Sequence, residues 1–188
     1  RSFRFKFNLD KATTKNSFVP RLWANRKIAM LIEEICQAGA ASGASPSVVA
    51  ANAKNDPKMK ELVDEIVRLS LQFGILTEYT AFLAKEGTDL NQRSQILRDA
   101  NDNLVYRAQN TRHGIGAVNQ LFNGNFQQTQ YRENRRNGFY DANMNRVQIT
   151  RVQQINDRAF FQQGNRWIDG NAVNSSRGAE PDRTVTAG

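Results

Sequence analysis

Residues 56–74 read DPKMKELVDEIVRLSLQFG, and this stretch decides the fold that we expect. Asp56 is a typical helix N-cap, Pro57 suits the first helical position, and Gly74 is the residue type that most often follows a helix. Between them, apolar side chains recur at helical spacing: Met59, Leu62, Val63, Ile66, Leu69 and Phe73. The spacing predicts an amphipathic helix that starts at Asp56-Pro57, stops at Gly74 and buries one face.

A second amphipathic helix is expected upstream, over residues 18–35 (FVPRLWANRKIAMLIEEI), with Pro20 in its first turn. Its apolar positions also follow 3.6-residue spacing: Ala24, Ile28, Leu31, Ile32 and Ile35. Residues 38–53 are rich in Ala, Gly and Ser, which predicts a flexible or weakly helical insertion. We therefore expect two antiparallel helices that share a core.

Strands are expected on both sides of this helical pair. Residues 75–83 (ILTEYTAFL) are rich in β-branched and aromatic side chains, which predicts a short extended segment. Residues 2–9 alternate apolar and polar side chains, so an extended strand would place Phe3, Phe5 and Phe7 on one face. A lone strand cannot satisfy its backbone, so we expect it to complete a sheet upstream or in a partner, or to pair with residues 79–83. The alternative is that it covers the local helices.

Downstream of residue 87 the helical pattern weakens. Apolar positions predict a third helix: Ile96, Leu97, Ala100, Leu104 and Ala108. The run 114–118 (GIGAV) and the Asn-Gly pairs at 123–124 and 137–138 predict breaks, with Leu121, Phe122 and Tyr131 on a fourth helix. Residues 147–152 alternate as a strand, and residues 159–169 (AFFQQGNRWID) predict a hairpin around Gly164-Asn165.

The expected fold class is α+β: a helical core of two to four helices, a short N-terminal strand that completes a sheet, and a C-terminal β-hairpin. Five segments follow from the pattern. They are a strand of an upstream or partner sheet (1–10), a helical α+β unit (11–90), an Asn/Gln/Arg-rich helical or irregular region (91–146), a β-hairpin unit (147–169) and a flexible tail (170–188).

Composition narrows the function. The chain has 188 residues, a net charge of +8, one His and one Cys, which excludes a zinc site built from His and Cys and an internal disulfide. No apolar run approaches the roughly 20 residues of a membrane span. Residues 1–90 hold 8 Lys and 5 Arg, whereas residues 91–188 hold 13 Arg and no Lys. Scattered Arg among Asn and Gln favours a protein interface, where Arg is enriched and Lys depleted, over a nucleic-acid surface.

The residues that could act in catalysis or ligand binding are each better explained by a structural role. His113 lies in a Gly-rich break without a nearby nucleophile, so a solvated turn histidine is expected. Cys36 shares a helix with buried isoleucines, which favours an inert buried thiol. The acidic side chains Glu33, Glu34, Glu61, Asp64 and Glu65 alternate with Lys and Arg on helix faces, as in solvated faces with ion pairs. Both tryptophans, Trp23 and Trp167, are expected in the core, with Trp167 packed across its hairpin on Phe160 or Phe161. We expect no catalytic centre, no cofactor and no metal.

Three motifs resemble a known family. The string FVPRLWA (Phe18–Ala24), the string ELVDEIVRLSLQFGILTEYT (Glu61–Thr80) and the closing GNRWID (Gly164–Asp169) are similar to the segment after the von Willebrand factor A domain in bacterial VIT/VWA proteins, relatives of the inter-alpha-trypsin inhibitor heavy chains. Glu78 stands where that family usually has Pro. The resemblance spans about residues 3–169, discontinuously. The A domain is missing: its Asp-x-Ser-x-Ser metal string has no counterpart, and the nearest approach, residues 43–47 (GASPS), lacks the carboxylate that a hard cation requires.

The resemblance implies an extracytoplasmic, periplasmic or secreted protein with a structural or protein-interaction role. The chain begins at Arg1 rather than Met, so we expect it to be part of a longer product. Its partner is then the remainder of the parent chain or another protein; the alternatives are an accessory subunit on a membrane-associated complex and a basic nucleic-acid module. The expected partner-binding residues are Phe3, Phe5, Phe7, Arg132, Arg135, Arg136, Arg158 and Arg166.

Overall fold

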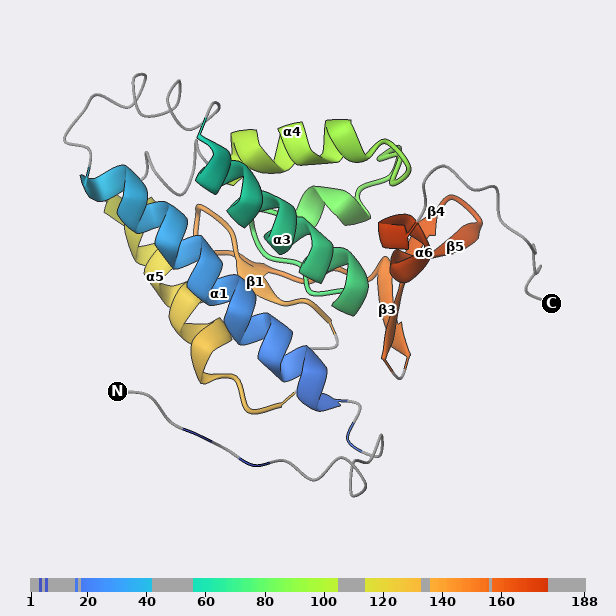
Figure 1. The fold of residues 1–188 in the computed structure, drawn as a ribbon, viewed down its shortest axis with the longest axis horizontal. Coiled ribbons are helices and arrows are strands. Elements are labelled where there is room, and N and C mark those ends of the chain that lie inside the picture. The colour runs from blue at the N-terminus through green and yellow to red at the C-terminus, as the bar shows by residue number, and fades with distance from the viewer. Residues whose placement is uncertain are drawn as a thin grey trace.

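The computed structural model confirms the α+β class, with helices and two small antiparallel sheets (Figure 1). It describes residues 4, 6, 16, 18–41, 56–104, 114–132, 136–155 and 157–175. The helices are α1 (Phe18–Ala41), α3 (Pro57–Phe73), the 3₁₀ helix η2 (Ala81–Ala84), α4 (Arg93–Asn103), α5 (Gly114–Thr129) and α6 (Gly170–Ser175). The strands are β1 (Phe139–Tyr140), β2 (Arg146–Val147), β3 (Val152–Ile155), β4 (Arg158–Gln163) and β5 (Arg166–Asp169). The expected N-terminal strand, with Phe3, Phe5 and Phe7, lies outside the described residues.

Helix α3 forms the centre of the core and has the predicted ends. The backbone N–H of Lys58 donates to the Asp56 side chain at 2.9 Å, and Gly74 follows the helix with φ +62°. Helix α1 packs antiparallel against α3 (Figure 1). Each helix turns its predicted apolar face toward the other, and one cluster of buried side chains includes residues from α1, α3, α4, β3, β4 and α6.

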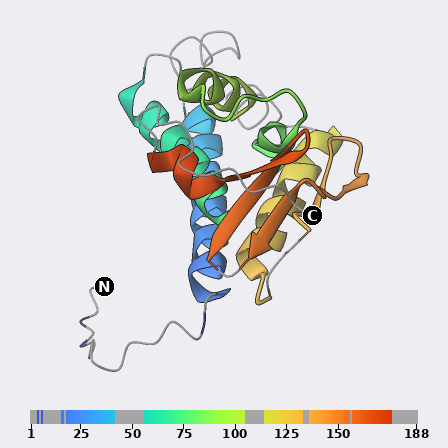
Figure 2. The ribbon, with the colours of Figure 1, turned by 90° about the vertical axis from the view of Figure 1, so that its right-hand side faces the viewer.

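The predicted hairpin is confirmed, and it is part of a three-stranded sheet with order β3-β4-β5. Phe161 pairs with Val152 on one side and Ile168 on the other, and its side chain is fully buried. The sheet lies beside the C-terminal end of α3 (Figure 2), so close that a Cβ on Gly74 would stand 2.7 Å from the Ala159 Cβ. A glycine at position 74 therefore serves both the helix end and the helix–sheet contact.

The flexible tail does not begin at residue 170 as expected. Residues 170–175 form α6, which packs on α3, and the Asn174 side chain donates to the Arg68 carbonyl at 3.0 Å. A Cβ on Gly170 would lie 2.0 Å from the Leu71 carbonyl oxygen. The short helix forms because this glycine permits close contact, which a polar sequence does not reveal.

The extended segment expected at residues 75–83 is wrong. These residues form turns followed by η2, since hydroxyl groups satisfy the backbone locally. The Thr77 N–H donates to Thr80 Oγ1 at 3.0 Å, and the Tyr79 N–H donates to Thr77 Oγ1 at 3.2 Å. Side chains of this type compete with strand pairing, so β propensity alone misled the prediction.

Two further element predictions are wrong. The glycines at 114–118 and the pair Asn123-Gly124 do not break a helix; α5 runs through both. The strand expected over residues 147–152 is two strands in different sheets, β2 and β3, with the Ile149 N–H bonded to the Arg136 carbonyl between them. Tertiary contacts override the local sequence pattern in both places.

The tryptophans do not lie in the core as expected. Trp23 is 54% exposed on α1 and Trp167 is 40% exposed on β5. The register pairs Phe161 with Ile168 on the core face of the sheet. Because side chains alternate between the two faces along a strand, the next pair, Gln162 and Trp167, lies on the opposite face.

Candidate functional site

Helix α5 has its polar and apolar faces reversed relative to α1 and α3. Its buried side chains are Asn119 and Asn123, whereas three apolar side chains at i, i+3 and i+7 are exposed: Ile115, Val118 and Phe122. The Phe122 ring also contacts the Tyr140 ring of β1 edge to face, with the ring centres 5.0 Å apart. Ile115 is 61% exposed and Val118 is 56% exposed. We refer to these three residues as the outer face of α5. An amphipathic helix normally buries such a face, so this one is available for contact.

The buried asparagines hold α5 to β1. The Asn123 side chain accepts from the Tyr140 N–H at 2.9 Å and donates to the Tyr140 carbonyl at 2.8 Å, as a neighbouring strand would. The Asn119 side chain donates to the same carbonyl at 2.7 Å and also to the Asp141 carbonyl. Polar contacts therefore replace apolar burial on this side of α5, and they leave its apolar residues on the surface.

Polar contacts also attach α5 to α1. The Asn25 side chain, buried on α1, donates to the Gln127 carbonyl at 3.0 Å, and Gln128 Nε2 donates to Glu33 Oε2 at 3.1 Å. These contacts fix the two helices side by side (Figure 1).

A groove of about 630 Å³ lies between α1 and α5. Its walls include apolar residues of both helices, and its floor comes from residues 75–79 and 137–139 with Gln154. We call it the α1/α5 groove. The apolar lining side chains are Leu22, Ala29, Ile32, Ile75, Leu76, Tyr79, Ala117, Leu121, Phe126 and Phe139.

Two amide side chains of the groove have unused hydrogen-bonding atoms. Asn137, 2% exposed, accepts from the Leu76 N–H through Oδ1 at 2.9 Å, while its Nδ2 has no partner among the described residues. Gln154 donates through Nε2 to the Gly74 carbonyl at 2.8 Å, and its Oε1 has no partner there either. Both atoms are buried, so each is a hydrogen-bonding group that the described residues leave unsatisfied beside the groove.

The expected partner-binding arginines occupy two regions. Arg132 and Arg136 are exposed after α5, and the Arg132 guanidinium lies 5.5 Å from the centre of the Tyr131 ring. Arg158 and Arg166 are exposed on the hairpin, where Arg158 pairs with Asp169 at 3.1 Å. Phe3, Phe5, Phe7 and Arg135 lie outside the described residues, as does His113. Cys36 is half-buried and lines the groove.

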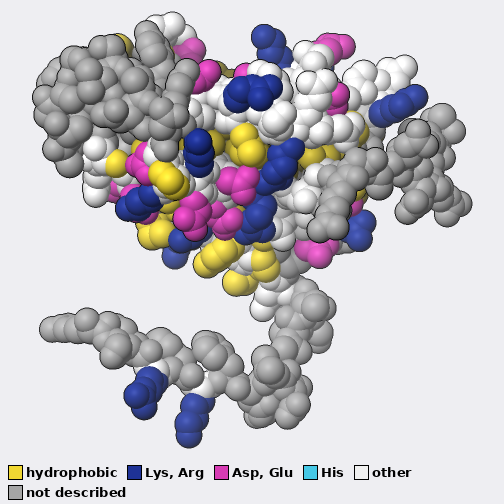
Figure 3. Space-filling model, turned by 45° about the horizontal axis from the view of Figure 1, so that its top comes forward, with side chains coloured by type: hydrophobic (Ala, Val, Ile, Leu, Met, Phe, Trp, Pro, Cys, Tyr) yellow, Lys and Arg dark blue, Asp and Glu magenta, His cyan; other side chains and the backbone are white. Residues whose placement is uncertain are grey.

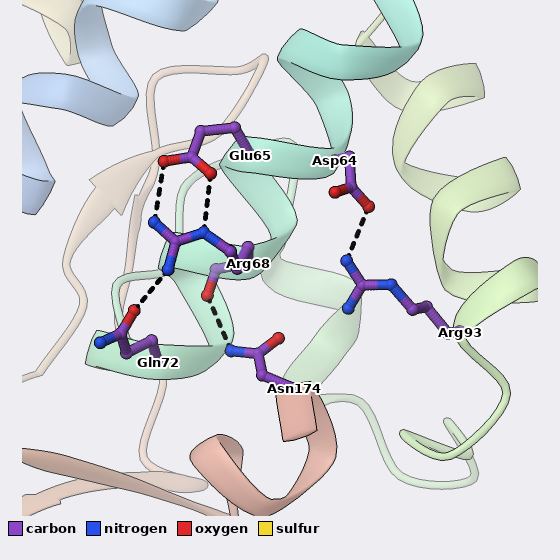
Figure 4. A network of polar contacts seen from close by, with 6 residues as sticks. All are labelled: Asp64, Glu65, Arg68, Gln72, Arg93 and Asn174. Atoms are coloured by element: carbon purple, nitrogen blue, oxygen red, sulfur yellow. Dashed lines mark hydrogen bonds and ion pairs between the residues drawn. The ribbon is translucent and has the colours of Figure 1, made fainter. Parts of the chain in front are cut away.

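Three of the acidic residues predicted to form ion pairs do so: Glu34 pairs with Lys58, Asp64 with Arg93 and Glu65 with Arg68, and the last two pairs are drawn in Figure 4. Both carboxylate oxygens of Glu65 accept from Arg68, at 2.7 and 2.8 Å, and the Arg68 guanidinium also donates to Gln72. Asp64 pairs with Arg93 of α4 at 2.6 Å. The hydrogen bonds from Arg68 lower the pKa of the Glu65 carboxyl, and Glu65 raises the pKa of Arg68. The carboxylate is thus held ionised, as in a structural pair rather than a proton donor.

The face drawn in Figure 3 mixes basic and acidic side chains, with apolar ones between them. Within the described residues, no three His, Cys, Asp or Glu side chains are grouped as a metal site requires, and no helix is long and apolar enough to cross a membrane. Compared with known protein families, characterised proteins and solved structures, the chain shows no significant match.

The outer face of α5 was missed at the sequence level, although a signal existed. Ile115, Val118 and Phe122 recur at i, i+3 and i+7, a helical spacing like the one that identified α3. Reading Gly114-Ile115-Gly116 as a break hid this pattern.

Proposed function

We propose that this chain is a non-catalytic structural and protein-interaction module, the C-terminal part of an extracytoplasmic VIT/VWA-type protein. The observation that carries the proposal is the outer face of α5, where apolar side chains at helical spacing remain exposed while asparagines are buried. The three sequence motifs that resemble the VIT/VWA family support the proposal that the parent protein is of this type.

The described arginines supply the polar part of the proposed interface. Arg132 comes three residues after the end of α5 and Arg136 seven residues after it, so we expect both to border a partner that covers this helix. An apolar centre with an arginine rim is the usual arrangement of a protein interface. Such binding is retained through moderate salt, whereas nucleic-acid binding held by phosphate contacts weakens steeply as salt rises.

The test is recovery of the partner from a native extract by the full chain, with Ile115→Glu against Ile155→Glu. Both isoleucines are exposed, 61% and 53%, but Ile155 belongs to β3 and not to α5. We expect Ile115→Glu to abolish recovery and Ile155→Glu to leave it intact, with both proteins folded by circular dichroism. Equal recovery of the partner by both variants would contradict the proposal that the outer face of α5 binds it.

The arginine contribution is tested separately. Replacing Arg132, Arg135 and Arg136 together with Gln should weaken recovery, whereas replacing Lys54, Lys58 and Lys60 with Gln should not. Intact recovery after the arginine replacement would contradict their role. Tight, salt-sensitive binding to mixed-sequence DNA or RNA would favour the nucleic-acid alternative.

A further inference from the structure

We propose that the α1/α5 groove binds a neutral lipid with one aliphatic chain and a small head group that both donates and accepts hydrogen bonds. Its volume of about 630 Å³ lies within the ~300–1,000 Å³ that is usual for small-molecule sites. The inference goes beyond the proposed function, because none of the three outer-face residues of α5 lines the groove.

Both helices give the groove apolar walls that solvent reaches. Helix α1 has one apolar stripe in the core with α3, which includes Ile28 and Ile35, and a second that lines the groove at helical spacing: Leu22, Ala29, Ile32 and Cys36. On α5, Leu121 and Phe126 line the groove and are 75% and 43% exposed. An aliphatic chain bound here would remove this apolar surface from water.

The groove is elongated, because it follows two helices that lie side by side (Figure 1). On α1 its lining extends from Arg21 to Gln37, which is ~24 Å at a rise of ~1.5 Å per residue. On α5 the lining extends from Ala117 to Gln128, which is ~17 Å. This shape suits an extended chain better than a compact ring system.

The unused hydrogen-bonding atoms of the groove lie at one end of it. Asn137 accepts from the Leu76 N–H, Gln154 donates to the Gly74 carbonyl, and Arg21 in the first turn of α1 donates to the Phe73 carbonyl at 3.3 Å. Asn137 and Gln154 are therefore held at the same turn, beside the start of α1. Among the described lining residues, the buried side-chain atoms without a partner are Asn137 Nδ2 and Gln154 Oε1. A bound peptide would need such atoms along its whole length, whereas a lipid needs them at its head only.

These two atoms define the head group. Asn137 Nδ2 requires an acceptor and Gln154 Oε1 requires a donor, and a primary amide or a hydroxyl group supplies both. Because both atoms are buried, we expect each amide to turn about its last side-chain torsion, which is broad, as the head group enters. The charged residues of the described lining are Arg21, Glu33 and Glu78, so the groove offers no excess positive charge to an anionic head group.

The first experiment uses Cys36, the single cysteine of the chain, as a reporter. Cys36 lines the groove ~22 Å along α1 from Arg21, so a lipid with its head at Asn137 reaches this thiol only if its chain is long. Hexadecanamide at about ten times its Kd should slow the reaction of the full chain with dithionitrobenzoate about tenfold. Hexanamide should leave the rate unchanged. No protection by hexadecanamide, or equal protection by both amides, would overturn the proposal.

The second experiment varies the head group on the same aliphatic chain. Hexadecanoate at pH 8 places a carboxylate where hexadecanamide places a neutral amide. We expect its half-protecting concentration for Cys36 to be about tenfold or more higher, because a buried charge without a paired cation is costly. Equal or tighter binding of hexadecanoate would overturn the neutral head group.

A matched pair on α5 assigns the binding to the groove. Leu121 lines the groove, whereas Val118 is on the outer face, and both are exposed, so both variants should fold. Leu121→Glu should weaken hexadecanamide binding about tenfold, while Val118→Glu should leave it unchanged. Equal loss in both variants, or no loss in either, would exclude the groove. Partner recovery through Ile115 is measured independently, so either proposal can fail alone.

Discussion

Helices α3 and α5 are of similar length, 17 and 16 residues, but they are held in opposite ways. Helix α3 buries its apolar residues and exposes its charges, with Ile66, Val67 and Leu69 fully buried. Helix α5 buries Asn119 and Asn123 and exposes Ile115, Val118 and Phe122. The difference shows that a helix can be fixed by a few buried amide groups, which leaves its apolar side for another molecule.

The largest loss of stability is expected on the buried apolar face of α3, and a much smaller one on the exposed outer face of α5. Ile66→Ala removes a fully buried side chain from the centre of the core and should cost about 2–5 kcal/mol of unfolding free energy. Ile115→Ala on the exposed face of α5 should change it by no more than about 0.5 kcal/mol. Urea unfolding followed by circular dichroism measures both. Similar losses would mean that the outer face of α5 is buried in the isolated chain.

The second largest loss of stability is expected when a buried asparagine side chain of α5 is removed. Asn123→Ala leaves the N–H and carbonyl of Tyr140 without this partner, which should cost about 1–3 kcal/mol. Asn125→Ala, on the exposed side of the same helix, is the control and should be nearly neutral. Urea unfolding of the pair gives the difference. If Asn123→Ala is also neutral, amide contacts do not position α5.

Replacing Gly124, in the second half of α5, with alanine should raise the stability of the fold. At Gly124 a Cβ would meet no atom within 4 Å, and alanine is the better helix former, so Gly124→Ala should stabilise by about 0.5–1 kcal/mol. Gly87 has equally open surroundings but φ +86°, so Gly87→Ala should destabilise. Thermal unfolding should show shifts of opposite sign. A loss at Gly124 would indicate that the groove side of α5 is already covered.

The smallest expected effect concerns the partly exposed ion pair between Glu65 and Arg68 on α3. Arg68 lowers the folded-state pKa of Glu65, so the pair stabilises the fold above the unfolded pKa, near 4.5, and its contribution is lost as pH falls through the lower folded value. Glu65→Gln should cost about 0.2–1 kcal/mol at pH 7, and the difference from wild type should shrink toward zero below pH 4.5. Glu61→Gln, on the exposed side of the same helix, is the control. A Glu65→Gln difference independent of pH would contradict the charge pairing.

The sequence predicts an element correctly where its local signals all indicate the same structure, and fails where they conflict and tertiary contacts decide. In α3 the cap, the proline, the apolar spacing and the closing glycine all indicate the same helix, and both ends are confirmed. The Gly164-Asn165 hairpin succeeds for the same reason. In α5 the local signals conflict: glycines and an Asn-Gly pair indicate breaks, while apolar spacing indicates a helix. The contacts of Asn123 with Tyr140 favour the helix, and they join residues 17 apart in the chain.

The sequence by itself determined the α+β class, the pair α1 and α3, and the C-terminal hairpin, because capping, periodicity and turn residues act over a few neighbours. Only the tertiary structure decided that residues 75–83 form turns, that residues 170–175 form a helix, and that α5 presents its apolar residues outward. The groove also depends on it, since its lining comes from α1, α5 and three segments far apart in the chain. Which face of a helix is buried depends on the partners that its polar groups find, and those partners are set by packing rather than by the local sequence.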